Sequence, residues 1–134
     1  MLLTKKSEYA LLSLVSIAKS DEPKNVEVLA TELGISKSFL AKILQNLAKH
    51  DILNSYKGNN GGFTLKKTCK ELTIMEITSI AEEKTPSVFE CTSSAGVCSS
   101  SMNGACSLFP LLANLQNKIN VFLDNLTLKD LLDS

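Results

Sequence analysis

The sequence predicts a mainly α-helical protein with a small β-hairpin wing: a winged helix-turn-helix domain plus a long dimerisation helix. Two short amphipathic helices are separated only by Gly34-Ile35-Ser36, which is the tight, glycine-containing turn of a helix-turn-helix. A glycine-rich hairpin signal follows directly, and a long apolar helical seam lies near the end of the chain. With 134 residues, the chain is large enough for one core but short for two.

The first half of the chain carries the helix-turn-helix signals. Residues 2–19 repeat apolar side chains at helical spacing and predict the first helix, and residues 20–25 predict a turn. A second helix over Glu27–Leu33 is expected to stop at Gly34, and Ser36 is expected to cap the third helix. The apolar stripe of this third helix consists of Leu40, Ile43, Leu44 and Leu47.

The next segment predicts a wing. Residues 52–57 and 62–66 are two short extended runs around Gly58-Asn59-Asn60-Gly61, and Asn-Gly between such runs is a strong hairpin signal. Because this hairpin comes directly after the third helix, residues 1–67 are expected to form a winged helix-turn-helix DNA-binding domain.

Residues 68–134 are expected to form a sensor loop and the dimerisation helices. Thr73–Glu76 has the pattern of a capping box and predicts a helix to about Glu83, and Thr127–Asp130 predicts a last short helix. Between them a longer helix begins at Leu108 and carries an apolar seam. The seam consists of Leu108, Leu111, Leu112, Leu115, Ile119, Phe122 and Leu126. A domain this small cannot cover all of the seam, so a homodimer is expected, with packing on its own winged helix as the alternative.

The net charge of zero hides an uneven distribution of charge along the chain. Residues 1–70 carry eleven lysines and six acidic residues, a balance of +5, while residues 71–134 carry three lysines and eight acidic residues, a balance of −5. A basic half is typical of a polyanion-binding module. The chain contains no arginine, so bidentate readout of guanine must come from lysine or be absent.

The composition also excludes several classes of protein. No apolar run approaches the roughly 18 residues that a membrane span needs, and the first residues resemble an amphipathic helix rather than a signal peptide. Four cysteines are too few for a secreted disulfide scaffold, so a cytoplasmic location is expected. His50 is the only histidine and is expected to contact main chain at a helix end. No base stands beside any thiol, so the chain is not expected to be an enzyme.

The third helix and the wing are the expected DNA contacts. Lysines on the helix face away from the apolar stripe can pair with phosphates, and serines there can reach phosphates or base edges. Glycine at the wing tip lets the main chain approach a minor groove. The residues expected to contact DNA are Ser36, Lys37, Ser38, Phe39 and Lys42 on the helix and Lys57, Gly58, Asn59 and Asn60 on the wing. A solvated lysine face is the structural alternative.

Three cysteines gather in a segment that can form neither a helix nor a packed strand. Cys91, Cys98 and Cys106 fall within sixteen residues that are otherwise mostly Ser, Gly, Ala, Asn and Thr, which favours chemistry at the thiols over packing. Zinc is disfavoured, because the gaps are six and seven residues and no fourth cysteine or histidine is near. A thiol–disulfide switch remains open, and an iron–sulfur cluster with one outside ligand is narrowly favoured. Cys69 lies outside this segment and is expected to pack as a small hydrophobe.

With a winged helix, a three-cysteine segment and a long apolar helix in that order, the chain resembles the IscR/NsrR-type family of bacterial iron–sulfur transcription regulators. The resemblance runs nearly from end to end. The resemblance is carried by Leu3-Thr4, Tyr9-Ala10, Leu29-Ala30, Gly34-Ile35-Ser36, Leu40, Lys57-Gly58-x-x-Gly61-Gly62-Phe63 and Phe122-Leu-Asp-Asn-Leu-Thr-Leu128. It implies a homodimer that binds double-stranded promoter DNA. We therefore expect a cytoplasmic repressor whose DNA affinity is set by an iron–sulfur cluster that senses nitric oxide, redox state or iron and cluster supply.

The resemblance also implies the ligands of this cluster. A [2Fe–2S] or [4Fe–4S] cluster would be held by Cys91, Cys98 and Cys106, whose gaps are longer than those usual in the family. Phe109 stands where the cluster-assembly branch of the family has a histidine ligand.

The nitric-oxide-sensing branch instead uses an acidic residue supplied by the partner subunit, and that position is Glu8 in this chain. Glu90, an external thiol and water are rival fourth ligands, and an exposed helix acid near Lys5 is the alternative reading of Glu8. Two other functions remain open: a metal-free thiol–disulfide redox regulator, and an interaction protein that has lost DNA binding.

Overall fold

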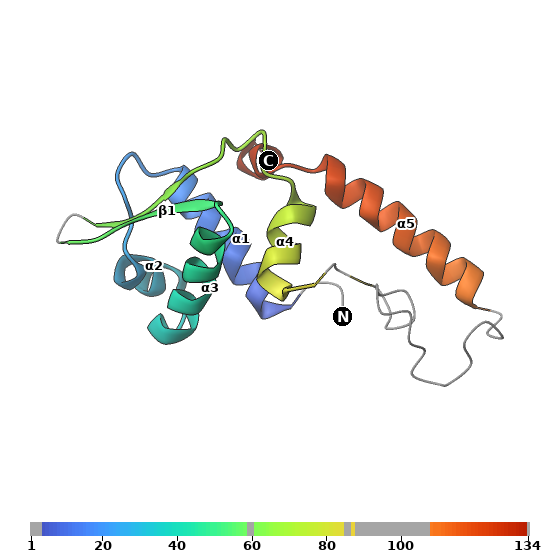
Figure 1. The fold of residues 1–134 in the computed structure, drawn as a ribbon, viewed down its shortest axis with the longest axis horizontal. Helices are drawn as coiled ribbons and strands as arrows, with labels where there is room; N and C mark the ends of the chain where they lie inside the picture. Colours follow the sequence, from blue (N-terminus) through green and yellow to red (C-terminus); the bar gives the residue numbers. More distant parts are fainter. Residues whose placement is uncertain (1–3, 59–60, 85–86, 88–107, 134) are drawn as a thin grey trace.

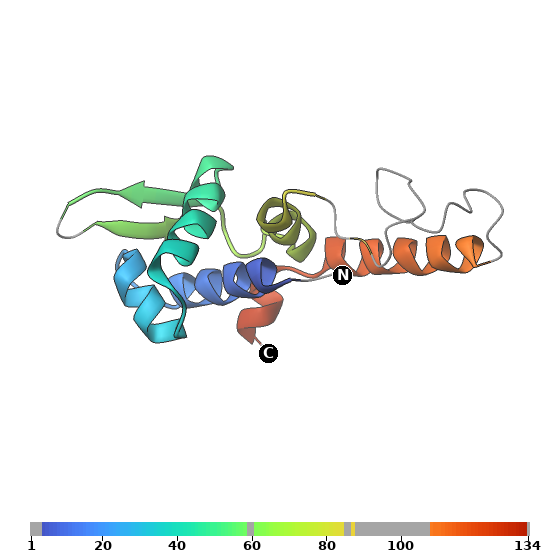
Figure 2. The same cartoon turned by 90° about the horizontal axis from the view of Figure 1, so that it is seen from below.

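The computed structural model describes residues 4–58, 61–84, 87 and 108–133, and its elements follow the predicted order (Figure 1). The elements are α1 (Lys5–Ala18), α2 (Val26–Leu33), α3 (Lys37–Lys49), β1 (Leu53–Tyr56), β2 (Gly62–Leu65), α4 (Ile74–Glu82), α5 (Phe109–Asn125) and α6 (Leu128–Asp133). The predicted fold class, mainly α with one antiparallel hairpin, is confirmed. Figure 2 shows α2, α3 and the hairpin gathered at one end of the molecule, while α5 projects from the other.

The first helix begins at Lys5, later than the predicted residue 2, because Thr4 caps it. Thr4 is extended (φ −105°, ψ 179°), and its Oγ1 accepts a hydrogen bond from Lys6 N at 3.2 Å. Residues 1–3 lie outside the described part of the chain. The helix then buries one face in the core and contacts α2, α3, α4, α6 and β2. The buried apolar residues of α1 are Ala10, Leu14 and Ile17.

The helix-turn-helix forms as predicted. Asn25 Oδ1 accepts from Val28 N at 2.8 Å and starts α2 one residue earlier than expected. Gly34 ends α2 in the left-handed conformation (φ +69°), where glycine is the least strained residue. Ser36 Oγ then accepts from Phe39 N at 3.3 Å and caps α3. The stripe of α3 that is buried consists of Leu40, Ile43, Leu44 and Leu47, as predicted.

The wing is a short antiparallel hairpin that requires glycine at the start of its second strand. Leu53 pairs with Leu65 and Tyr56 pairs with Gly62. Gly62 has φ +148°, and a Cβ on it would lie 2.5 Å from the main-chain carbon of Lys24. The chain therefore passes so closely against the segment before α2 that no side chain fits at residue 62.

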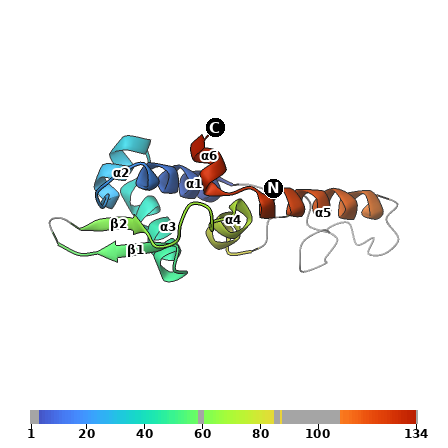
Figure 3. The same cartoon turned by 90° about the horizontal axis from the view of Figure 1, so that it is seen from above.

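The C-terminal half completes the same core instead of forming a separate one. Figure 3 shows α4 and α6 near α1, and both helices contact it. Leu128 N donates to Leu72 O at 2.9 Å, and Ile74 N donates to Leu126 O at 2.8 Å. These main-chain hydrogen bonds join the segment before α4 to the segment between α5 and α6. The residues that this half adds to the core are Leu72, Ile74, Ile77, Ala81, Leu123 and Leu128. The predicted division at residue 67 thus remains a proposal about function, because the core crosses it.

Both predicted caps of the C-terminal helices are present. Thr73 Oγ1 accepts from Glu76 N at 3.1 Å, and Glu83, in the left-handed conformation, ends α4. Thr127 and Asp130 form a reciprocal capping box: Thr127 N donates to Asp130 Oδ2 at 2.9 Å, and Asp130 N donates to Thr127 Oγ1 at 3.4 Å. None of the helices in the described ranges is both long and apolar enough to cross a membrane.

Two glycines with positive φ give a test of this fold. Gly62→Ala should lower the free energy of unfolding by about 2 kcal/mol or more, because a Cβ there meets Lys24 main chain and the backbone conformation is strained for other residues. Gly34→Ala should cost only about 1 kcal/mol, since nothing lies within 4 Å of its added Cβ. Urea unfolding of the two variants measures the difference, and equal losses would contradict the close approach at Gly62.

Candidate nucleic-acid interface

The outer face of α3 carries a polar stripe along its whole length. Ser38, Lys42, Gln45 and Lys49 are all exposed and recur every three or four residues, opposite the buried leucines. This is the geometry with which a helix can enter a major groove and present side chains to base edges. Gln45 was not predicted as a contact, although its position three residues after Lys42 would have placed it on the same face.

Lys37 is placed at the start of α3 as predicted, but its charge is already engaged. Its Nζ lies 2.5 Å from Oε1 of Glu27 in the first turn of α2, and both side chains are exposed. The hydrogen bond from Lys37, together with its charge, holds the pKa of the Glu27 carboxyl below its ordinary value. A phosphate that approaches Lys37 must therefore compete with the Glu27 carboxylate.

Lys42 and Lys57 differ from Lys37 in this respect. Both are exposed, and neither has an acidic oxygen within 4.0 Å among the residues that the structure describes. Gly58 follows Lys57 with φ +100°, and its carbonyl accepts from Gly61 N at 3.0 Å, which turns the chain at the wing tip. Asn59 and Asn60, also predicted to contact DNA, lie outside the described residues.

Phe39 corrects one prediction about this face. It was expected on the outer side of α3, but its ring is half-buried and packs edge-on against Tyr9 of α1, with the ring centroids 5.7 Å apart and the planes at 86°. An apolar ring next to a core helix gains more from burial than from water, so the residue turns inward. Phe39 therefore helps to hold α3 on α1. Ser36 is exposed and serves as the helix cap, with its Oγ 3.1 Å from Ser38 Oγ.

The predicted metal ligands are only partly placed. Cys91, Cys98 and Cys106 lie outside the described residues, and within the described ranges no group of three or more His, Cys, Asp or Glu side chains could hold a metal ion. Glu8 is exposed on α1, and its Oε2 is 3.2 Å from Lys5 Nζ. The same side chain lines an apolar groove on α1, so its position fits both readings that the sequence left open.

His50, the only histidine, and Cys69, the cysteine outside the three-cysteine segment, lie where the sequence predicted. His50 ends α3, and its Nδ1 lies 2.9 Å from the main-chain oxygen of Asn46. Cys69 is partly buried against the core. Among the described residues, neither belongs to a group of side chains that could hold a metal ion.

The comparisons with known proteins agree on a regulator of transcription. A family described as "Rrf2: Iron-dependent Transcriptional regulator" matches residues 3–134 of the chain. The HTH-type transcriptional regulator IscR of Escherichia coli O1:K1 is 27% identical over 136 residues, covering 100% of this chain and 82% of that protein.

Solved structures share the fold at lower identity. CymR, the global cysteine regulator of B. subtilis, superposes with a TM-score of 0.75 at 20% identity, covering 99% of this chain and 97% of that one. IscR of T. potens superposes with a TM-score of 0.75 at 18% identity, covering 99% of this chain and 87% of that one.

The Lys37–Glu27 pair yields a prediction about DNA affinity. Glu27→Gln should tighten binding to duplex DNA about twofold to fivefold at low salt, because an exposed ion pair worth less than about 1 kcal/mol no longer competes with phosphate. Fluorescence anisotropy with a labelled duplex measures the change. Lys37→Ala should cost more affinity in the Glu27→Gln background than in the wild type, and equal costs would show that the pair does not restrain Lys37.

Proposed function

We propose, since this chain belongs to the Rrf2 family of transcriptional regulators, that it is a cytoplasmic, homodimeric repressor whose affinity for promoter DNA is set by an iron–sulfur cluster. The observation that carries DNA binding is the exposed polar stripe of α3 on a helix-turn-helix that is followed by a wing. Lys42 in this stripe has no acidic partner among the residues that the structure describes. The proposed effect on transcription is repression. A protein that occupies promoter DNA can block transcription with its DNA-binding surface alone. The proposed contacts are Ser36, Lys37, Ser38, Lys42 and Gln45 on α3 and Lys57, Gly58, Asn59 and Asn60 on the wing.

The face of α5 that carries the apolar seam supports a homodimer. Leu108, Leu111, Leu115 and Phe122 are 57%, 63%, 41% and 64% exposed, and these positions share one side of the helix. In the body of the molecule α5 packs against α4, and the helix extends away from the other elements (Figure 1). A contiguous apolar stripe of this kind is unfavourable in water and is typical of an interface.

A groove on the body of the same chain offers the matching surface. It has a volume of about 480 Å³ and is lined by Leu11, Leu12 and Val15 of α1 and Leu131 of α6, with Thr4 and Glu8 also lining it. None of the described residues of the chain's own α5 lines this groove. In a two-fold dimer, the seam of each α5 can meet the partner's body, so that both apolar surfaces are covered by one isologous interface.

This dimer gives Glu8 a role that a single chain does not. Cys106 precedes Leu108, the first residue of the seam, by only two positions. Docking α5 with Leu108 towards the Glu8 end of the partner's groove brings the cysteine segment of one chain close to Glu8 of the partner subunit. Glu8 and Lys5 remain an ordinary exposed ion pair if the dimer has another orientation.

The donor set of the chain fits an iron–sulfur cluster. Three thiols on one segment with one carboxylate from outside it match thiolate ligation in which a non-cysteine residue completes the site. We assign Cys91, Cys98 and Cys106 as the thiolate ligands and Glu8 of the partner subunit as the fourth. When bound, such a cluster supplies a redox-active centre, which is what a sensor of redox state, nitric oxide or cluster supply needs.

The end of α4 supports a connection between the cysteine segment and the DNA-binding helices. Asn46 of α3 donates from Nδ2 to Ile80 O in the last turn of α4 at 2.9 Å. Glu82, also in that turn, accepts through Oε1 from Thr4 Oγ1 at the start of α1. A change in the chain after α4 therefore acts directly on the helix that reads DNA and on the helix that lines the proposed dimer groove.

The homodimer can be tested by placing a charge on the seam. Phe122→Glu should weaken self-association at least about thirtyfold, because burying an unpaired carboxylate in an apolar interface costs several kcal/mol. Asn117→Glu adds the same charge on another side of α5 and should leave the dimer intact. Sedimentation velocity or light scattering measures the mass, and a Phe122→Glu protein that remains a dimer would remove α5 as the interface.

The cluster can be tested by purifying the protein without oxygen. The wild type should carry iron and acid-labile sulfide and should absorb visible light, and Cys98→Ser should lose most of both. Cys69→Ser should keep them, because Cys69 packs against the core. A colourless, iron-free protein whose DNA affinity still responds to oxidation would overturn the cluster. Mass spectrometry that finds a reversible disulfide among Cys91, Cys98 and Cys106 would then support the metal-free thiol regulator.

The fourth ligand can be tested by comparing the stability of the cluster to oxygen in two further variants. Glu8→Ala should make the cluster less stable to oxygen, whereas Lys5→Ala, which frees the same carboxylate from its ion pair, should not. A Glu8→Ala protein that keeps its cluster and its resistance to oxygen would show that Glu8 is only an exposed helix acid.

A further inference from the structure

Lys24, which no motif singled out, joins the wing to the body through its main chain. Lys24 N donates to Phe63 O at 3.2 Å, and Phe63 N donates to Lys24 O at 2.8 Å, so the segment before α2 forms an antiparallel bridge with β2. Gly62, next to Phe63, is the residue whose missing side chain allows this close approach. Strand β2 of the wing, close to the turn end of the hairpin, thus rests on one residue of the α1–α2 connection.

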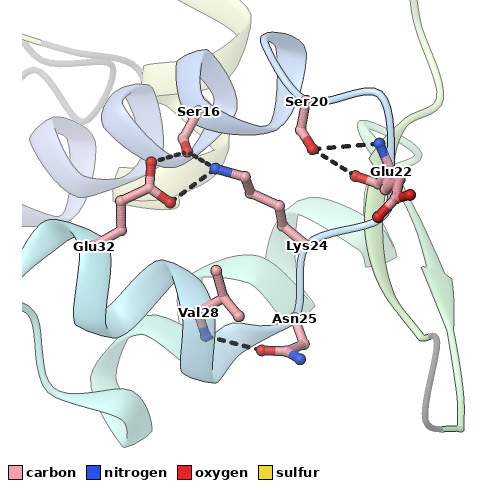
Figure 4. Close-up of polar contacts among 7 residues, drawn as sticks. All are labelled: Ser16, Ser20, Glu22, Lys24, Asn25, Val28 and Glu32. Atoms are coloured by element: carbon pink, nitrogen blue, oxygen red, sulfur yellow. Dashed lines mark hydrogen bonds and ion pairs between the residues drawn. The ribbon is translucent and has the colours of Figure 1, made fainter.

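The side chain of the same residue is tied to two helices (Figure 4). Lys24 Nζ donates to Glu32 Oε2 of α2 and to Ser16 Oγ of α1, both at 2.8 Å, and Ser16 Oγ donates to Glu32 Oε1 at 3.0 Å. The three residues form a closed network, and the Lys24 side chain is only 21% exposed. The hydrogen bonds from Lys24 and Ser16 lower the pKa of the Glu32 carboxyl, so the acid is ionised at neutral pH.

The chain around Lys24 is ordered by its own short contacts. Ser20 Oγ donates to Glu22 O at 2.8 Å and accepts from Glu22 N at 3.3 Å, and Asn25 caps α2 directly after Lys24 (Figure 4). Lys24 is therefore held on both sides as well as through its own side chain.

We propose that Ser16, Lys24 and Glu32 act as a clamp that sets the orientation of the wing relative to α3, and that Lys24 is a positioning residue for DNA binding and not a DNA contact. This inference rests on the proposed DNA-binding function. Its basis is that one residue carries both the main-chain bridge to β2 and the side-chain bonds to α1 and α2, the helices against which α3 packs. Since its ammonium group already has two partners, Lys24 has little left to offer a phosphate.

A clamp of this kind affects the affinity for DNA, because it sets the fraction of molecules whose wing is oriented for binding. A duplex presents its two grooves at a fixed spacing, so α3 and the wing must reach them together. If the wing samples other orientations, the apparent affinity falls in proportion to the competent fraction.

The clamp and simple electrostatics predict opposite changes in DNA affinity for Glu32→Ala. Glu32→Ala removes a negative charge from the basic half, which by itself tightens binding to DNA. If the clamp operates, Glu32→Ala should instead weaken binding to a specific duplex by about threefold to tenfold. Glu27→Ala is the matched control: it removes the same charge from the same helix, frees Lys37, and should tighten binding. Lys57→Ala should also cost less in the Glu32→Ala background, because the wing no longer contacts DNA in its best orientation, whereas the cost of Lys42→Ala should not change.

Hydrogen exchange at Phe63 provides a readout that does not need DNA. In Glu32→Ala, the amide of Phe63, which donates to Lys24 O, should exchange about tenfold faster, while it should be unchanged in Glu27→Ala. Unchanged exchange, or binding as tight in Glu32→Ala as in Glu27→Ala, would overturn the clamp. A wild-type protein that binds no DNA while Phe63 still responds as expected would refute the proposed function but not the anchoring of the wing.

Discussion

The burial of α1 is the constraint on which the rest of the structure depends. Its inner face, with Leu14 fully buried at the centre, contacts α2, α3, α4, α6 and β2. Elements from both ends of the chain therefore take their positions from one helix. Side chains at its edges extend this role: Tyr9 holds Phe39 of α3, and Ser16 binds Lys24, whose main chain bridges to β2 of the wing. The C-terminal helices α4 and α6 and the helix-turn-helix are therefore packed into one unit through α1.

The positive charge of residues 1–70 is less available to an anionic partner than the lysine count of this half indicates. Several of its lysines are held by acidic partners within the chain, and these are Lys5, Lys24, Lys37, Lys66 and Lys67. Lys42 and Lys57, by contrast, have no acidic oxygen within 4.0 Å in the described part of the chain, so their charge is free to meet phosphate. Because exposed pairs are weak, Lys37 can still exchange its partner, whereas Lys24 is shielded and bonded twice. In the roles proposed for them, Lys37 contacts DNA and Lys24 holds the wing in place.

The apolar surfaces divide in a similar way between folding and assembly. Leu123 on α5 is buried in the core, while Phe122 beside it is exposed on the seam. One helix therefore belongs both to the monomer and to the proposed dimer. The groove over α1 and α6 places Glu8 at the same proposed interface, so assembly, ligand supply and helix position would depend on one set of contacts. This arrangement explains how an acid that looks like an ordinary surface residue could matter to a site on another chain.

The sequence by itself determined the order and type of the elements, because these depend on local chemistry. Gly34 and Ser36 mark the turn through backbone freedom and side-chain capping, and the leucines of α3 mark its buried face through their spacing. Only the tertiary structure decided which polar groups meet. Glu27 reaches Lys37, and Glu32 reaches Lys24 and Ser16, through packing between helices that no spacing along the chain encodes. Phe39 turned inward for the same reason, since the ring that it packs against, Tyr9, comes from α1.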